Sequence, residues 1–147
     1  MATIWNHPAR TALVMRAGAL TPAHTARWGQ FSVAGMVAHL NDSLRMAFGE
    51  LTVNAKAPSI LKWAPMRYLV IHLLPMPKGA PTAPELIART SDADLARELE
   101  SFVALFARFD GPVVLAPTHP AFGRMTADDW GALIHKHTDH HLRQFGA

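Results

Sequence analysis

The chain has 147 residues, of which 50% are hydrophobic and 17% charged, so its composition favours a folded domain over a disordered chain. It contains no cysteine, which excludes disulfides, thiolate metal ligands and a cysteine nucleophile. The formal net charge of +3 comes from scattered lysines and arginines without a basic stripe, which argues against nucleic acid as a partner. We therefore expect one domain that spans residues 1–147.

The hydropathy pattern gives no sign of a membrane segment. The N-terminus has no apolar run behind a basic start, as a signal peptide would have. The most apolar stretch, residues 68–74, is far shorter than the roughly 20 residues that span a bilayer. The sequence thus predicts a cytoplasmic protein without a membrane partner.

Helical spacing dominates the first third of the chain. One helix is expected over about residues 8–17, with a proline tolerated in its first turn. A longer helix is expected over residues 33–48, with Ser32 as its N-cap and Gly49 as its stop. The core-facing side of this second helix would carry Val33, Met36, Val37, Leu40, Leu44, Ala47 and Phe48.

The middle of the chain is less regular, because six prolines lie between residues 58 and 84. Short helices are expected at about residues 60–74. Ser91 with Asp94 three residues later predicts a capped start for a helix that runs to Phe109. The inward residues of this helix would be Leu95, Leu99, Phe102, Val103 and Phe106.

The last part of the chain predicts a long connection followed by a helix. Residues 111–125 suggest a non-helical segment with at most a short extended piece and no sheet. Thr126 with Asp129 predicts the cap of the final helix, and Gly146 follows its end. Four main helices joined by long, irregular crossings indicate an all-α fold, a helical bundle.

Four of the nine histidines lie within residues 135–141 of this final helix. His137 and His141 are four residues apart, which places both imidazoles on one face of a helix. This is the spacing at which helices present two imidazoles to one zinc-type ion. The same face carries apolar residues that predict an inward orientation of both rings, namely Trp130, Leu133, Ile134 and Phe145.

Two imidazoles on one helix hold a divalent ion loosely, so a third ligand is needed. His39 is the best candidate, because it lies at the edge of the core-facing side of another helix and bundle sites gather ligands from facing helices. Three imidazoles leave one coordination position open for water or substrate, as in catalytic zinc sites. An ion held in this way would acidify a bound water molecule.

The alternative is that these histidines bind no metal. His135 and His140 are explained equally well by the dipole at the end of a helix, or by a supporting role beside the ligands. A single histidine such as His39 at the edge of a core is commonly just hydrogen-bonded. His119 precedes a proline in a loop, where forming a turn or a pocket lip is as good an explanation as ligation.

Three polar residues near the histidines are candidate partners for the imidazole nitrogens that do not bind metal. Asp42 follows His39 by three residues, and Asp139 lies between the paired histidines, although it also fits a solvated surface carboxylate. Gln144 lies three residues after His141 and is expected to face the same pocket. The serines have no nucleophile-elbow context, and the chain has no glycine-rich phosphate loop.

A set of motifs runs from Trp28 to the C-terminus: Trp28-Gly29, Met36-Val-Ala-His39-Leu, Pro77-Lys-Gly-Ala-Pro-Thr82, His119-Pro-Ala-Phe-Gly123 and His137-Thr-Asp-His-His141-Leu-Arg-Gln144-Phe-Gly146. This set resembles the DinB-like superfamily, and within it a branch of small bacterial proteins of unknown function. The closing His-x-x-His-His-x-Arg-Gln pattern is the specific part of the resemblance, and the other motifs support it.

The resemblance implies a four-helix bundle, often a homodimer, in which three histidines hold a divalent metal such as Zn, Ni or Fe. One histidine comes from the second helix and two come from the last, which maps onto His39, His137 and His141. Characterised relatives include transferases and isomerases that use a low-molecular-weight thiol as co-substrate. The name of the superfamily refers to DNA damage and does not indicate DNA binding.

Two functional hypotheses follow. The first is a metal-dependent enzyme, either a thiol S-transferase or a hydrolase, in which the metal activates a thiol or water. The second is a non-catalytic helical bundle that binds a metal or a small ligand, or serves as an interaction module. The second is favoured by the lack of a glutamate near the histidines, since no general base is obvious. A third possibility is a purely structural one, in which the helical fold binds no metal at all.

Overall fold

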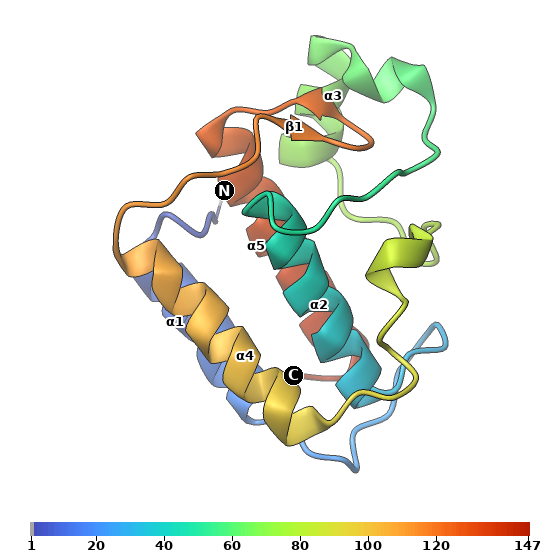
Figure 1. Ribbon diagram of the computed structural model, residues 1–147, viewed down its shortest axis with the longest axis vertical. Helices are drawn as coiled ribbons and strands as arrows, with labels where there is room; N and C mark the ends of the chain where they lie inside the picture. The colour runs from blue at the N-terminus through green and yellow to red at the C-terminus, as the bar shows by residue number, and fades with distance from the viewer. Residues whose placement is uncertain (1) are drawn as a thin grey trace.

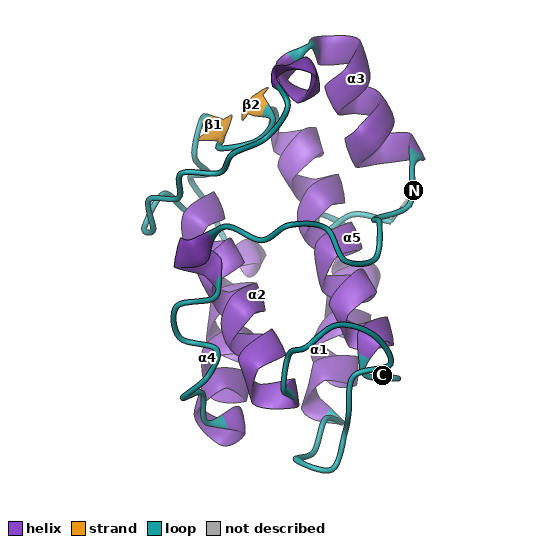
Figure 2. Ribbon diagram, turned by 90° about the vertical axis from the view of Figure 1, so that its right-hand side faces the viewer, coloured by secondary structure: helices purple, strands orange, loops and turns teal. Residues whose placement is uncertain are grey.

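The computed structural model describes residues 2–147, which are mostly helical. Its four long α-helices are α1 (His7–Gly18), α2 (Val33–Ala47), α4 (Leu95–Ala107) and α5 (Ala127–Gln144). Helix α2 packs against α4 and α5, and α1 packs against the same two helices. Figures 1 and 2 show the four helices side by side, with the short helix α3 (Ala64–Tyr68) beyond one end of them.

The helix ends are set by side chains that accept backbone N–H groups. The hydroxyl of Ser32 accepts from Gly35 N at the start of α2, as predicted. At the start of α5, Thr126 and Asp129 form the predicted capping box, in which each side chain accepts from the backbone of the other. These two helices, which carry the three candidate ligands, therefore begin at the predicted residues.

Helix α4 differs from the prediction at its start and on its face. Its N-cap is Asp94, whose carboxylate accepts from Arg97 N at 3.1 Å, so the expected start at Ser91 was wrong. The α-helix ends at Ala107 and continues as the 3-10 turn η4 (Arg108–Asp110). Val103 is 49% exposed and not part of the core, whereas Leu105 is buried. The later start removes the first predicted turn from the helix. It does not account for the end at Ala107 or for the exposure of Val103.

The segment between α2 and α4 forms short pieces. They are the 3-10 turns η1 (Ser59–Lys62) and η3 (Pro84–Leu86), the helix α3 and the π-helical turn η2 (Leu69–Leu73). Pro65 lies in the first turn of α3, where its missing N–H costs nothing, so a helix forms despite it. Lys136 of α5 donates to the carbonyls of Val70 and Leu74, at 2.6 and 2.8 Å, and thereby holds η2 against α5.

The connection between α4 and α5 contains a pair of two-residue strands, β1 (Thr118–His119) and β2 (Gly123–Arg124). They pair antiparallel, with Thr118 opposite Arg124 and His119 opposite Gly123. The prediction of no sheet was therefore wrong. Strands of two residues are too short to show an alternating hydrophobic pattern, which is why the sequence gives no sign of them.

The core lies among the four long helices. Its most deeply buried large side chains include Leu13, Met36, Leu40, Phe102, Phe106 and Leu142. Among residues 2–147, no helix has both the length and the apolar character needed to cross a membrane.

Candidate metal centre

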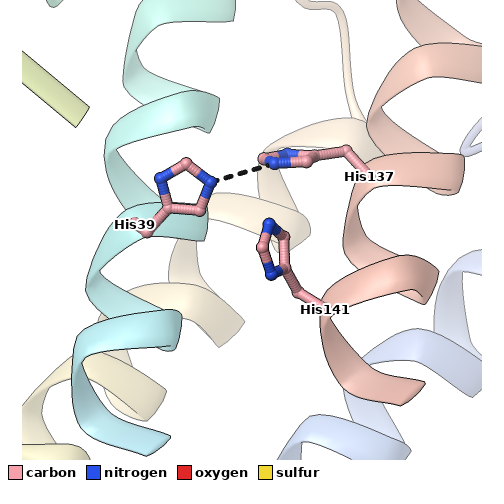
Figure 3. A group of neighbouring side chains, drawn as sticks. All are labelled: His39, His137 and His141. Carbon is pink, nitrogen blue, oxygen red and sulfur yellow. Dashed lines mark hydrogen bonds between the residues drawn. The ribbon is translucent and has the colours of Figure 1, made fainter. Parts of the chain in front are cut away.

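Three imidazoles from α2 and α5 converge in the interior of the molecule. His39 projects from α2 towards His137 and His141, which lie one turn apart on α5 (Figure 3). The Nε2 atoms of His39 and His137 are 3.0 Å apart, and one nitrogen of each ring lies within 4.8 Å of the other two. The structure thus brings together the three predicted residues in a group that could hold a metal ion; that they bind one stays a prediction.

The surroundings of the three rings are apolar. His39 is only 3% exposed, and the ring of Phe31 stacks on its imidazole with the ring centroids 5.1 Å apart. The same phenyl ring meets His141 edge-on at 5.8 Å. Phe31 was not among the residues predicted for the site. Its position just before the N-cap Ser32 is one where an apolar residue commonly packs against the helix, and this was the available signal.

The orientation of His39 is fixed by a backbone carbonyl. Its Nδ1 lies 3.0 Å from the carbonyl oxygen of Leu86, in η3. Because a carbonyl oxygen only accepts, Nδ1 carries the proton and donates it, which leaves the lone pair of a neutral ring on Nε2. Nε2 is the atom that faces His137, so the free lone pair of His39 points into the cluster.

The orientation of His141 is fixed by Gln144. The amide nitrogen of Gln144 donates to the carbonyl of Trp28 at 2.6 Å, so its amide oxygen is turned towards His141 Nδ1, 2.7 Å away. His141 therefore donates from Nδ1 and keeps its lone pair on Nε2. Gly29 allows this arrangement, since its φ is +77° and a Cβ there would lie 2.8 Å from the amide nitrogen of Gln144. Gln144 thus faces the same pocket as His141, as expected.

All three rings are held in the neutral form that metal ligation requires. Burial lowers the pKa of His141 to about 3, and the neighbouring His39 adds to this effect. Burial also lowers the pKa of His39 below its usual 6.5. For His137, burial and then the other imidazoles hold the pKa well below the usual value.

The donor set fits a divalent ion. Nitrogens bound to one ion at about 2.0–2.1 Å lie roughly 3–4 Å from one another, and the nitrogens of these three rings already lie within 4.8 Å of one another. Neutral imidazole suits Zn, Ni and Fe alike. Two of the three rings already have their second nitrogen engaged as a donor, which is the usual arrangement of metal-bound histidine.

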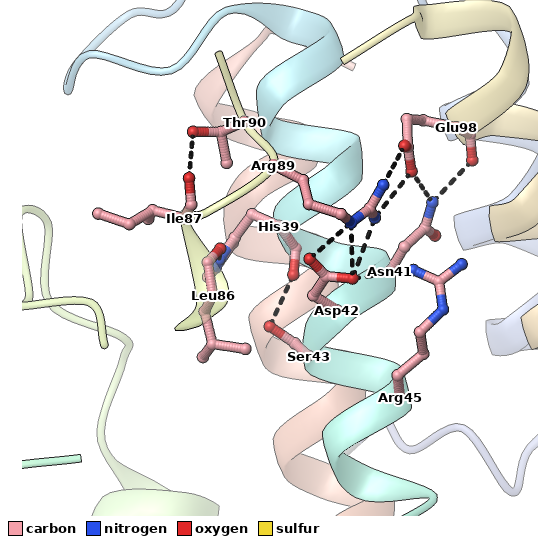
Figure 4. Close-up of polar contacts among 10 residues, drawn as sticks. All are labelled: His39, Asn41, Asp42, Ser43, Arg45, Leu86, Ile87, Arg89, Thr90 and Glu98. Carbon is pink, nitrogen blue, oxygen red and sulfur yellow. Dashed lines mark hydrogen bonds and ion pairs between the residues drawn. The ribbon is translucent and has the colours of Figure 1, made fainter. Parts of the chain in front are cut away.

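Neither aspartate orients a ring, which makes the candidate role of Asp42 wrong and, for Asp139, agrees with the favoured alternative of a carboxylate that does not serve the site. The carboxylate of Asp42 accepts from Arg89 and Arg45 instead (Figure 4). That of Asp139 pairs with Arg16 and with Arg143, which lies one turn further along α5. Arg45 and Arg143 lie about one turn further along the same helices as their partners, a spacing that the sequence shows. Arg89 and Arg16 come from other segments, whose packing against these helices the sequence does not reveal. The arginine charges outcompete an imidazole N–H for the carboxylates.

The remaining histidines of α5 are not helix-end residues. Helix α5 ends at Gln144, so His135 lies in the middle of the helix and His140 lies just before its last turn, where the helix dipole contributes less than within that turn. Burial lowers the pKa of each ring, which further removes a role as a cation. The ring of His140 packs against Trp28 with centroids 5.4 Å apart.

His119 has a turn-forming role. Its Nδ1 accepts from the backbone N–H groups of Ala121 and Phe122, at 3.0 and 3.4 Å. Burial lowers its pKa to about 4, so the ring is neutral and its Nδ1 stays available as an acceptor. This side chain closes the tight turn between β1 and β2, and it belongs to the wall of the cavity described next rather than to the three-imidazole cluster.

A cavity of about 680 Å³ adjoins the three imidazoles. Helices α2 and α5 line part of it, and four connecting segments, residues 28–31, 53–61, 75–87 and 119–122, contribute most of its other walls. A ligand held by the cluster would therefore be shielded from solvent by these connecting segments as well as by the long helices.

A family model described as "Protein of unknown function (DUF1569)" matches residues 6–147, which is nearly the whole chain. No curated protein matches the chain. No solved structure matches it either.

Proposed function

The chain belongs to the DUF1569 family, and we propose that it is a metal-dependent enzyme in which His39, His137 and His141 hold one divalent ion. The observation that carries the proposal is the fixed direction of two lone pairs. Leu86 O and Gln144 Oε1 each accept an Nδ1 proton, which turns Nε2 of His39 and His141 inward. A buried ring needs an acceptor for its N–H in any case, so the support lies in where the other nitrogens point: toward one another, as one shared ion would require.

We further propose that the fold is a four-helix bundle of the DinB-like superfamily. The support is the packing of α2 and α1 against both α4 and α5, with one ligand on α2 and two on α5. The homodimer that this resemblance implies stays a prediction, to be tested by the molar mass in solution.

The charge balance of the site favours an anionic fourth ligand. Three neutral imidazoles leave the two positive charges of the ion uncompensated, and Asp42 is already neutralised by Arg45 and Arg89. Among the described residues, those that line the adjoining cavity include no carboxylate. A thiolate or a hydroxide from outside the chain would supply the missing charge.

The chemistry that the ion supplies when bound is to lower the pKa of a thiol or water and hold it as a nucleophile. The protein contributes orientation and exclusion of water. Leu86 and Gln144 hold protons on the outer nitrogens of two rings, and Phe31 covers the face of His39. A thiol S-transferase and a hydrolase are the two reaction types that these roles serve.

The metal content of purified protein tests the proposal. After loading with Zn, Ni or Fe(II) and gel filtration, we expect about one ion per chain by elemental analysis. His39→Ala, His137→Ala and His141→Ala should lose it, whereas His135→Ala and His140→Ala, on the same helix but outside the cluster, should keep it. A folded wild-type protein that takes up none of the three metals would refute the proposal.

A non-catalytic binding protein is the second candidate. It is favoured by the missing carboxylate in the cavity lining of the described chain, since a hydrolase normally has a base beside the attacking water. Water-proton relaxation with a paramagnetic ion such as Mn(II) at the site separates the two. Exchangeable water on the ion supports the enzyme, and a fully shielded ion supports the binding protein.

A further inference from the structure

The walls of the cavity beside the three imidazoles are mainly apolar. Side chains from both helices and from all four connecting segments contribute, among them Phe31, Leu40, Leu61, Met76, Phe122 and Ile134. Its volume of about 680 Å³ lies in the range of roughly 300–1,000 Å³ that small-molecule sites occupy. The space is therefore large enough for a ligand much bigger than one water molecule.

Three of the polar side chains in these walls already have partners within the protein. The ammonium group of Lys136 donates to two backbone carbonyls. Gln144 uses its amide nitrogen on Trp28 and its amide oxygen on His141. The Nδ1 of His119 accepts two backbone N–H groups.

Charged partners for a ligand are correspondingly scarce. Throughout residues 2–147, the cavity lining includes no aspartate, glutamate or arginine, and its other lysine, Lys56, is exposed to solvent. A ligand with several charged groups would lose its hydration here without gaining partners, which is costly. An apolar ligand would gain from contact with these walls over most of its surface.

We infer that the substrate of this site is an apolar compound whose one polar group, a thiol, lies at the three imidazoles. The assignment of the thiol rests on the proposed function. The apolar character of the rest of the compound is inferred from the cavity alone. Such a site differs from one built for a low-molecular-weight thiol that carries carboxylates and an ammonium group. We therefore expect a preference for alkyl or aryl thiols.

The first test uses N-phenyl-1-naphthylamine, an uncharged fluorophore that brightens in apolar surroundings. We expect it to bind to the metal-free and the metal-loaded protein alike. Met76→Lys places a charge on the cavity wall and should weaken binding about tenfold or more. Met15→Lys is the matched control, because Met15 is 71% exposed on α1, away from the cavity. Both variants should keep the helical circular dichroism of the wild type.

The second test is competition on the metal-loaded protein. We expect 1-octanethiol to displace the fluorophore at concentrations at which glutathione, a thiol with several charges, does not. Octanethiol should also compete better than 1-octanol. In the His137→Ala variant we expect this difference between thiol and alcohol to disappear, although the variant should still bind the fluorophore. The last comparison reports on the thiol at the imidazoles, and the others report on the apolar walls.

Failures of the two ideas are distinguishable. Three results would overturn the inference of an apolar substrate and leave the metal site standing. They are stoichiometric metal uptake without binding of the fluorophore, equal binding by Met76→Lys and Met15→Lys, and equal displacement by glutathione and octanethiol. Fluorophore binding in a protein that takes up no metal would overturn the proposed function and the thiol assignment with it.

Discussion

Arg89 joins the segment before α4 to the middle of α2 through Asp42. Its guanidinium lies 3.0 and 3.1 Å from the two carboxylate oxygens of Asp42, and it also donates to Glu98 of α4 at 2.7 Å (Figure 4). Both carboxylates are buried, with side chains 7% and 5% exposed. Leu86, whose carbonyl orients His39, lies only three residues before this anchor, so the ion pairs position the candidate metal centre from outside it.

Arg89→Ala should therefore destabilise the fold and weaken metal binding together. Loss of the guanidinium leaves two buried carboxylates without their main partner, which we expect to cost about 1–3 kcal/mol in the free energy of unfolding. Urea titration followed by circular dichroism measures this cost. Arg97→Ala removes an exposed arginine from the same region and should change neither property; an equal effect of the two substitutions would contradict the role of Arg89.

Glu98 should make stability depend on pH in the acidic range. Burial raises its pKa, but the hydrogen bonds from Arg89 and Asn41 and the charges of Arg89 and Arg45 together outweigh burial and hold the pKa below its usual 4.5. The folded state thus binds fewer protons than the unfolded state, so Glu98 stabilises the protein above about pH 4.5, and this contribution is lost as the pH falls through the lower folded pKa.

The measurement is the urea midpoint of wild type and Glu98→Gln across that range. We expect the midpoint of the wild type to fall more steeply on acidification than that of Glu98→Gln. Glu100→Gln, an exposed site on the same helix, should retain the slope of the wild type. Parallel slopes for wild type and Glu98→Gln would show that the buried ion pair does not contribute.

Gln144→Leu should lower the metal affinity. The substitution keeps a side chain of similar size but removes the acceptor that holds the proton on His141 Nδ1. Loss of such a partner typically weakens metal binding by about 10–100-fold. Competition with a chelating indicator gives the affinity, and Gln30→Leu, an exposed glutamine beside the cavity, is the control. The prediction fails if both variants bind metal as tightly as the wild type.

Gly29→Ala should also disturb the orientation of His141, by displacing the side chain of Gln144. Gly29 and Gly49 both have a φ near +75°, so alanine at either position should cost about 1 kcal/mol of stability from backbone strain. Only at Gly29 would the added Cβ collide with the amide of Gln144, since a Cβ at Gly49 meets nothing within 4 Å. Weaker metal binding in Gly29→Ala but not in Gly49→Ala is the expected result, and equal affinities would contradict it.

His119→Ala should loosen one wall of the cavity without removing a ligand. The ring fixes the turn from Ala121 to Phe122, and its loss leaves two backbone N–H groups without an acceptor. We expect faster amide hydrogen exchange in residues 119–123 and weaker binding of the fluorophore, with metal stoichiometry unchanged. His119→Asn, whose side-chain oxygen can accept the same groups, should restore much of the protection.

The sequence by itself determined what depends on neighbours a few residues apart. The N-cap Ser32 predicted the start of α2, the capping box predicted the start of α5, and hydrophobic spacing predicted both helices. The four-residue interval placed His137 and His141 on one face. The sequence also indicated that His39 lies on the inward side of another helix, so the three residues of the cluster were predictable. Where a local pattern was weak, as at the start of α4 or in the two-residue strands, the prediction failed.

Only the tertiary structure decided which way the rings face and what surrounds them. The carbonyl that orients His39 belongs to Leu86, 47 residues away, and a backbone carbonyl leaves no mark in the sequence. The same holds for the bond from Gln144 to Trp28 and for the turn of Asp42 towards Arg89 instead of an imidazole. These contacts form because packing of distant segments brings partners together, and helical periodicity carries no information on that packing.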